Sequence, residues 1–137
     1  MANVFTKFKV HVVKKLIDLS ADTLKLMLMK TTYTVNLDTQ DIYSDISSEE
    51  ITGTGYTAGG KTLTSVVVNE DAANHRMKLT AADVSWTTAT FTARYAVLYD
   101  STTTHLISYY DLGAAQSPAG VTFTIQWDAT NGVLTNT

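Results

Sequence analysis

The chain contains no cysteine. Disulfide bonds and thiolate metal sites are therefore excluded, and stability has to come from packing or from partner subunits. Charged residues are also scarce: they make up 17% of the 137 residues, against about a quarter in an average globular protein. Neutral polar side chains, threonine above all, must cover most of the surface. Because threonine is β-branched, its abundance favours strands.

An excess of basic residues is missing as well. The net charge at pH 7 is −3, so no basic stripe is present to neutralise phosphates, and nucleic acid is an unfavourable partner. The longest apolar run, Leu24 to Met29, is interrupted by Lys25 and is too short to cross a bilayer. The N-terminal segment lacks the apolar stretch of a secretory signal. We expect no membrane association and synthesis in a reducing cytoplasm.

A length of 137 residues and one composition throughout predict a single domain, 1–137. Its first 20 residues are expected to form an N-terminal helix or arm, because apolar residues recur there at the spacing of one helical face. A strand remains the alternative for this segment, since Val10 and Val13 are β-branched. The residues on the helical face are Phe5, Phe8, Val12, Leu16 and Leu19.

Residues 21–137 are expected to form a β-sandwich. Thr23 to Thr31 reads as a strand buried on both faces, and Asn36 to Ser48 as a polar loop with one helical turn at Asp41 to Ile46. Short apolar runs then alternate with turn residues, which is typical of a sandwich or barrel. The expected strands are Thr62 to Val68, His75 to Leu79, Val84 to Trp86, Thr90 to Tyr99, Leu106 to Leu112 and Val121 to Trp127.

The connections between these strands predict a β meander. Thr90 to Tyr99 is the candidate for a central strand, because even its second face is only half polar. Asp100 to Thr104 has the composition of a hairpin loop, and Ala114 to Gly120 provides the next connection. A turn at Asn131 and Gly132 allows a short last strand to fold back. The expected class is mainly β, an antiparallel sandwich of which a jelly roll is one version.

Residues Gly55 to Thr62 match the P-loop pattern of glycine, four residues, then Gly-Lys-Thr. In that interpretation Lys61 would bind the outer phosphates, and Thr62 and Asp100 would bind magnesium. The pattern requires a buried strand before the loop and a helix after it. Here the preceding residues are polar, and Leu63 to Val68 has strand character. A flexible, glycine-rich surface loop is therefore the favoured interpretation.

Other catalytic or metal-binding patterns are not evident. His11, His75 and His105 are far apart in the sequence, and no pair has a spacing that places two metal ligands on one face of an element. No nucleophile elbow of the form Gly-x-Ser-x-Gly occurs. Glu49 and Glu50 are neighbours in an extended segment and should point to opposite sides. We therefore predict no catalytic residues, no metal site and no cofactor.

Aromatic residues offer one further candidate site, a platform for stacking sugars or bases. Packing within a small β protein is the favoured interpretation, because aromatic pairs across strands are a common source of core stability. The aromatic residues concerned are Trp86, Trp127, Tyr95, Tyr99, Tyr109 and Tyr110.

From Leu24 to its end the chain resembles a family of small virion proteins of tailed bacteriophages, described as head decoration or fibre proteins. In that family the position of Lys61 is also occupied by residues other than lysine. The resemblance therefore implies that the glycine loop is a family feature and that the nucleotide motif is accidental. The family implies no catalytic residues. The resembling stretches, in the family's order, are Thr23 to Tyr33, Thr52 to Gly60, Ala82 to Trp86, Phe91 to Asp100 and Phe123 to Asp128.

The resemblance implies a non-enzymatic capsid decoration, or cement, protein on the surface of the phage head, made in the host cytoplasm. It would self-associate as a dimer or trimer and clamp neighbouring copies of the major capsid protein. Such a clamp works by binding alone, for which apolar and neutral polar surface suits better than charge. A neck, tail or fibre component is the alternative. A glycan-binding module and an NTPase are more remote alternatives.

Two segments that extend from the predicted strands are the expected partner contacts: the N-terminal segment through Leu19, and the loop from Thr52 to Lys61. On this hypothesis, removing Met1 to Val10 abolishes capsid association and leaves the domain folded. The expected contact residues are Phe5, Phe8, Val12, Gly53, Gly55, Tyr56, Gly59, Gly60 and Lys61.

Overall fold

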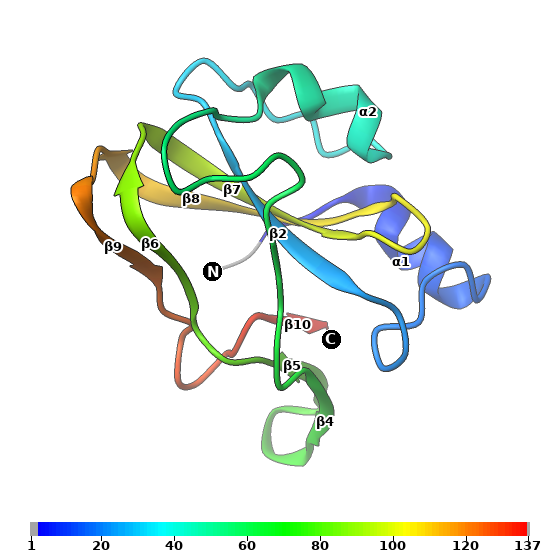
Figure 1. Ribbon diagram of the computed structural model, residues 1–137. Coiled ribbons are helices and arrows are strands. Elements are labelled where there is room, and N and C mark those ends of the chain that lie inside the picture. Colours follow the sequence, from blue (N-terminus) through cyan, green and yellow to red (C-terminus); the bar gives the residue numbers. More distant parts are fainter. Residues whose placement is uncertain (1–2, 137) are drawn as a thin grey trace.

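The computed structural model of the chain describes residues 3–136. A five-stranded antiparallel sheet with the order β1-β8-β7-β2-β3 forms its centre (Figure 1). The strands of this central sheet are β1 (Asn3–Val4), β2 (Leu24–Met29), β3 (Lys61–Thr62), β7 (Ala93–Asp100) and β8 (Leu106–Gln116).

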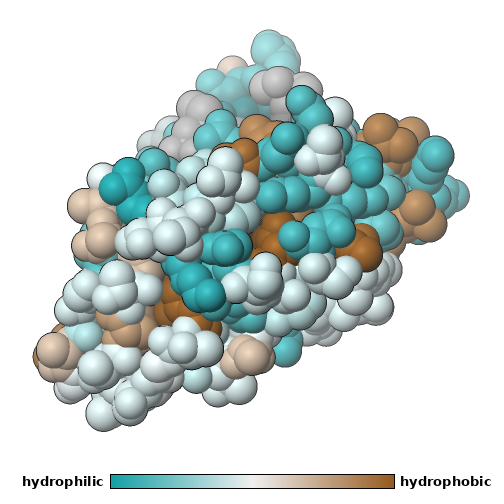
Figure 2. Space-filling model, turned by 90° about the horizontal axis from the view of Figure 1, so that it is seen from above, coloured by the Kyte–Doolittle hydropathy of each residue, from teal (hydrophilic) through white to brown (hydrophobic). Residues whose placement is uncertain are grey.

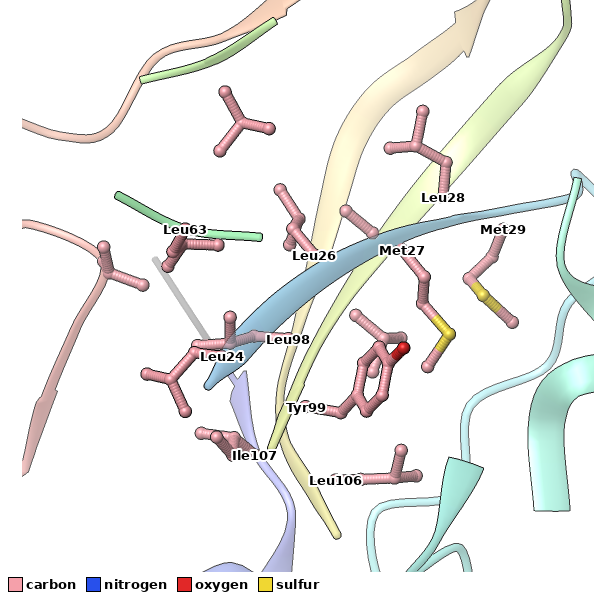
Figure 3. Close-up of a cluster of buried hydrophobic side chains, with 14 of the residues drawn as sticks. Leu24, Leu26, Met27, Leu28, Met29, Leu63, Leu98, Tyr99, Leu106 and Ile107 are labelled. Carbon is pink, nitrogen blue, oxygen red and sulfur yellow. The ribbon is translucent and has the colours of Figure 1, made fainter. Parts of the chain in front are cut away.

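Strand β2 is buried on both faces, as its apolar sequence predicts. Five of its six residues are buried. Leu26 and Leu28 point to one side of the strand and Met27 and Met29 to the other (Figure 3), because successive side chains of a strand alternate. Strand β7 pairs with β2 and with β8, which confirms the predicted central strand, although the strand begins at Ala93 and not at Thr90.

The remaining strands extend the β7–β8 hairpin and close the core. Strand β6 (Val84–Thr90) pairs with β9 (Ala119–Ile125), and β10 (Leu134–Asn136), β5 (Arg76–Thr80) and β4 (Val67–Asp71) form a three-stranded sheet. Only two residues separate β6 from β7, and two separate β8 from β9. One long hairpin therefore bends back on itself, on the left of Figure 1.

The mainly β class, with antiparallel sheets and a short N-terminal helix, is confirmed. The strands divide into sheets of five, three and two, which differs from the two four-stranded sheets of a jelly roll. The prediction of one strand over Thr62 to Val68 is wrong: the chain breaks near Ser65, whose φ is 54°, into β3 and β4. The predicted meander ends at β8, because β9 pairs with β6 and β10 pairs with β5.

The helical segments are short. Helix α1 spans Thr6–Val13 and ends before Lys15, which adopts a φ of 60°, so it is shorter than the expected Phe5 to Leu19. Helix α2 (Tyr43–Ile46) confirms the predicted turn. Two 3₁₀ turns, η1 (Ser47–Glu49) and η2 (Ala72–Asn74), complete the set. None of the helices in residues 3–136 is long and apolar enough to cross a bilayer.

The N-terminal segment belongs to the core and is not an arm. Strand β1 pairs with β8, and the amide of Phe5 donates to the carbonyl of Ile107 at 3.0 Å. The side chains of Phe5 and Phe8 are 0% and 1% exposed. Met1 and Ala2, which belong to the same expected segment, lie outside the described residues.

Candidate functional site

The glycine loop, Thr52 to Lys61, is held in place by a buried glutamate. Glu50 is 7% exposed. Its Oε1 accepts hydrogen bonds from the hydroxyl of Tyr56 at 2.6 Å and from the amide of Gly59 at 2.7 Å, and its Oε2 accepts one from the hydroxyl of Tyr43 at 2.6 Å. Three donors therefore satisfy the buried carboxylate. We call Glu50, Tyr43, Tyr56 and Gly59 the Glu50 cluster.

Further hydrogen bonds join the Glu50 cluster to the central sheet. The hydroxyl of Tyr56 accepts from the amide of Leu28 at 3.0 Å, and the hydroxyl of Tyr99 donates to the carbonyl of Gly59 at 2.7 Å. The rings of Tyr43 and Tyr99 stack with centroids 5.2 Å apart. The loop is thus a layer packed on β2 and β7, in contrast to the expected flexible extension.

Glycine is required in this loop because the backbone approaches other strands closely. Gly60 has a φ of +77°, and a β-carbon there would overlap the carbonyl oxygen of Leu26. At Gly53 a β-carbon would lie 2.5 Å from the carbonyl oxygen of Thr90. A side chain at either position would push the loop away from the sheet.

The P-loop interpretation is wrong. Strand β3, and not a helix, follows the loop, and a 3₁₀ turn precedes it in the position of the buried strand. The amide of Gly59, which a P-loop would direct at a phosphate, binds the carboxylate of Glu50 instead. A buried negative charge at that point repels a second anion.

The nine expected contact residues differ in their exposure. The prediction that Phe5 and Phe8 contact a partner is wrong, because both are buried in the chain's own core. Val12 is 37% exposed and remains accessible. Gly53, Gly55 and Lys61 are exposed, whereas Tyr56, Gly59 and Gly60 are partly buried.

Trp86 does not belong to a sugar-binding platform. Its side chain is 1% exposed, and its ring packs between those of Tyr56 and Phe123, with centroid distances of 6.3 and 5.9 Å. Tyr99 is also buried, at 5% exposure. For these two residues the expected packing within the β structure is confirmed.

Part of the expected contact segment, the N-terminal segment through Leu19, is an exposed apolar surface at the end of α1. Val13 is 83% exposed and Leu16 is 47% exposed. Leu16 was expected on the same helical face as Phe5 and Phe8, but α1 ends at Val13 and the chain turns at Lys15. Beside this segment lies a hollow whose lining includes Val12 and, from β4, Val68. We call Val12, Val13, Leu16 and Val68 the α1 apolar surface.

Hydrophobic side chains also gather at the right-hand end of the molecule in Figure 2, on the side where α1 lies in Figure 1. Much of the remaining surface in that view is pale, the colour of side chains with intermediate hydropathy. This agrees with the scarcity of charge in the sequence.

No protein-family model, curated protein or solved structure matches the chain. The assignment of function therefore depends on the geometry of the described residues and on the phage resemblance of the sequence.

Tyrosines around Glu50 resist ionisation. Burial, followed by the hydrogen bonds to Glu50 and the charge of Glu50, raises the pKa of Tyr43 and of Tyr56 well above its usual value. Burial and the charge of Glu50 raise the pKa of Tyr99 to about 12. The pKa of an unperturbed tyrosine is about 10, so the folded state favours the protonated phenols.

We expect the protein to lose stability in alkali. Because the folded pKa values are raised, these tyrosines contribute stability that is complete below pH about 10 and is lost as the pH rises towards the folded values. A pH titration should follow phenolate absorbance and circular dichroism together. These buried tyrosines should ionise only as the protein unfolds. Ionisation of all seven tyrosines near pH about 10 with native dichroism would contradict this.

Proposed function

We propose that this chain is a capsid decoration, or cement, protein of a tailed bacteriophage, which binds the assembled head shell and stabilises it without a chemical step. The observation that carries the proposal is the α1 apolar surface, on which Val13 is 83% and Leu16 47% exposed. The resemblance of the sequence to virion proteins supports the choice of partner, which is the major capsid protein.

Physical chemistry favours such a role for a surface of this kind. Apolar area removed from water stabilises a complex by about 25 cal/mol per Å². Val13 and Leu16 provide such area, and the exposed Lys14 and Lys15 between them keep their charged ends in water at the edge of a contact. Whatever binds the assembled shell more tightly than its separated subunits stabilises the shell by mass action. Binding alone is therefore enough for the function.

The Glu50 cluster supports the same role indirectly. By holding the glycine loop on the sheet, it presents the exposed residues Gly53, Gly55 and Lys61 in one conformation. A rigid loop loses little conformational entropy on binding. In this proposal the loop and the α1 apolar surface contact capsid subunits or neighbouring copies of this chain, which associates as a dimer or trimer on the outside of the head.

Copy number and surface substitution together test the proposal. In virions of the phage that encodes the chain, quantitative mass spectrometry should give a ratio to the major capsid protein near one, or a simple fraction of it. The double variant Val13→Ser with Leu16→Ser should bind expanded shells about tenfold or more weakly, because burial of a Val or Leu side chain is worth about 1.5–3 kcal/mol.

Val121→Ser is the matched control for these substitutions. Val121 is also an exposed valine, at 56%, but it lies in β9, on the side of the molecule opposite α1 (Figure 1). Its substitution should leave shell binding unchanged. A ratio of a few per cent would favour a neck, tail or fibre component instead, and absence of the chain from virions would refute the virion assignment.

A further inference from the structure

Three segments that are distant in the sequence bring two histidines and an aspartate together. His11 comes from α1, Asp41 precedes α2, and His105 ends the loop of the β7–β8 hairpin. Nε2 of His11 lies 2.8 Å from Oδ1 of Asp41, and Nδ1 of His105 lies 3.4 Å from the same oxygen. The two imidazole rings stack with centroids 3.9 Å apart. We call these residues the His-Asp cluster.

Backbone pairing fixes the relative position of Asp41 and His105. The amide of Leu106 donates to the carbonyl of Asp41 at 2.8 Å, and the amide of Tyr43 donates to the carbonyl of Thr104 at 2.9 Å. Ile42 and His105 form a bridge of the antiparallel type. Since α1 is attached to the same region through the bond from Phe5 to Ile107, the cluster is preorganised by the fold.

The imidazole nitrogens of the cluster are short of partners. Nδ1 of His11 and Nδ1 of His105 are buried, and within the described part of the chain neither takes part in a hydrogen bond. Buried polar atoms in folded proteins nearly always have a partner. Neutral imidazole is also the commonest metal ligand in proteins, so an ion at this point would provide His105 with the missing interaction.

Asp41 supplies a negative charge for the same point. Its Oδ1 lies 2.8 Å from Nε2 of His11 and 3.4 Å from Nδ1 of His105. The ammonium group of Lys7 lies 3.7 Å from Oδ2 and leaves Oδ1 facing the two rings.

The donor atoms are close enough to share one ion. One ligand atom from each of the three residues lies within 4.8 Å of the other two. Around a tetrahedral zinc ion, with bonds of about 2.0–2.2 Å, neighbouring donors are roughly 3.3–3.6 Å apart. The two rings stack with an interplanar angle of 29°, so they have to rotate apart for both nitrogen lone pairs to point at one ion. Two nitrogen donors and one oxygen donor suit zinc and other divalent first-row transition metals, whereas magnesium and calcium prefer oxygen ligands alone.

We propose that His11, Asp41 and His105 form a binding site for a divalent transition-metal ion, represented by zinc, with the remaining coordination position filled by water or by a partner's side chain. The ion would tie α1 to the β7–β8 hairpin and to the segment before α2. The proposal is independent of the capsid assignment, because it depends only on contacts within the chain.

Calorimetric titration of the untagged full chain with zinc chloride tests the site. We expect one ion per chain, a higher melting temperature with zinc, and no binding of magnesium chloride. His11→Ala and His105→Ala should each weaken zinc binding at least tenfold. His75→Ala is the matched control, because His75 is the third histidine of the chain and is exposed in a separate turn; it should bind zinc as the wild type does.

A measurement without substitution covers the case in which a variant fails to fold. Nuclear magnetic resonance of the histidine ring nitrogens in the wild-type chain should show zinc-dependent shifts at His11 and His105, and none at His75. Shifts at His75 alone, or no saturable shifts at any histidine, would refute the site. Equal zinc affinity in the wild type and in folded His11→Ala and His105→Ala variants would refute it as well.

Discussion

Removing Met1 to Val10 should unfold the domain. This deletion takes away β1, which pairs with β8, together with Phe5 and Phe8, whose side chains are 0% and 1% exposed. Truncating one buried phenylalanine to alanine typically costs about 3–5 kcal/mol, and a domain of this kind has a total stability of about 5–15 kcal/mol. Loss of both rings, about 6–10 kcal/mol, together with loss of a strand is therefore comparable with the whole stability of the fold.

A single substitution makes the same prediction measurable in a folded protein. Phe8→Ala should lower the free energy of unfolding, measured by urea denaturation, by about 3–5 kcal/mol. Val13→Ala is the control in the same helix: because Val13 is 83% exposed, its effect should stay within about 0.5 kcal/mol. If Phe8→Ala cost less than about 1 kcal/mol, Phe8 would not be a core residue and the N-terminal segment could act as an arm.

This result would also explain why the sequence alone misplaced the contact surface. The spacing of Phe5 and Phe8 correctly predicts one apolar helical face. An apolar face has the same pattern whether it packs on the chain's own core or on a partner, so the pattern cannot identify what covers it. The residues that remain exposed, Val13 and Leu16, depend on where the helix ends, and Lys15 sets that end through its left-handed conformation.

Local patterns predicted the local elements well. About ten residues of sequence are enough to recognise each of three features. These are the apolar run in β2, the alternation in β7 and the polar loop of the β7–β8 hairpin. The pairing of β6 with β9 and of β5 with β10 was not predicted, because it depends on the bend in the long hairpin and on which faces meet in the core. No short window of sequence contains that information.

The side-chain clusters show the same limit. The expectation that Glu49 and Glu50 lie in an extended segment is wrong, because Glu49 ends the 3₁₀ turn η1. The two side chains nevertheless differ in burial: Glu50 is buried, and Glu49 bonds to Thr32 at the surface. Nothing in the local sequence says which of the two faces inwards. Likewise His11 and His105 are 94 positions apart, from 105 minus 11, and meet because the backbone bond from Phe5 to Ile107 attaches α1 beside the β7–β8 hairpin.

Glu50→Ala should be among the most destabilising single substitutions outside the apolar core. It would leave the hydroxyls of Tyr43 and Tyr56 and the amide of Gly59 without their acceptor. Hydrogen bonds to a charged group are worth about 1.5–3 kcal/mol each, and their losses do not add fully. We expect the free energy of unfolding, measured by urea denaturation, to fall by about 3–5 kcal/mol.

The adjacent glutamate separates the effect of the Glu50 cluster from the effect of charge. Glu49→Ala removes the same charge but only one surface bond, from Thr32 at 2.7 Å, and should cost less than about 1 kcal/mol. Glu50→Gln should lie between the two, because its amide oxygen still accepts the bonds made by Oε1. Equal losses of unfolding free energy in Glu49→Ala and Glu50→Ala would assign the effect to net charge. Faster hydrogen exchange of the Gly59 amide in Glu50→Ala alone would assign the effect to release of the glycine loop from the sheet.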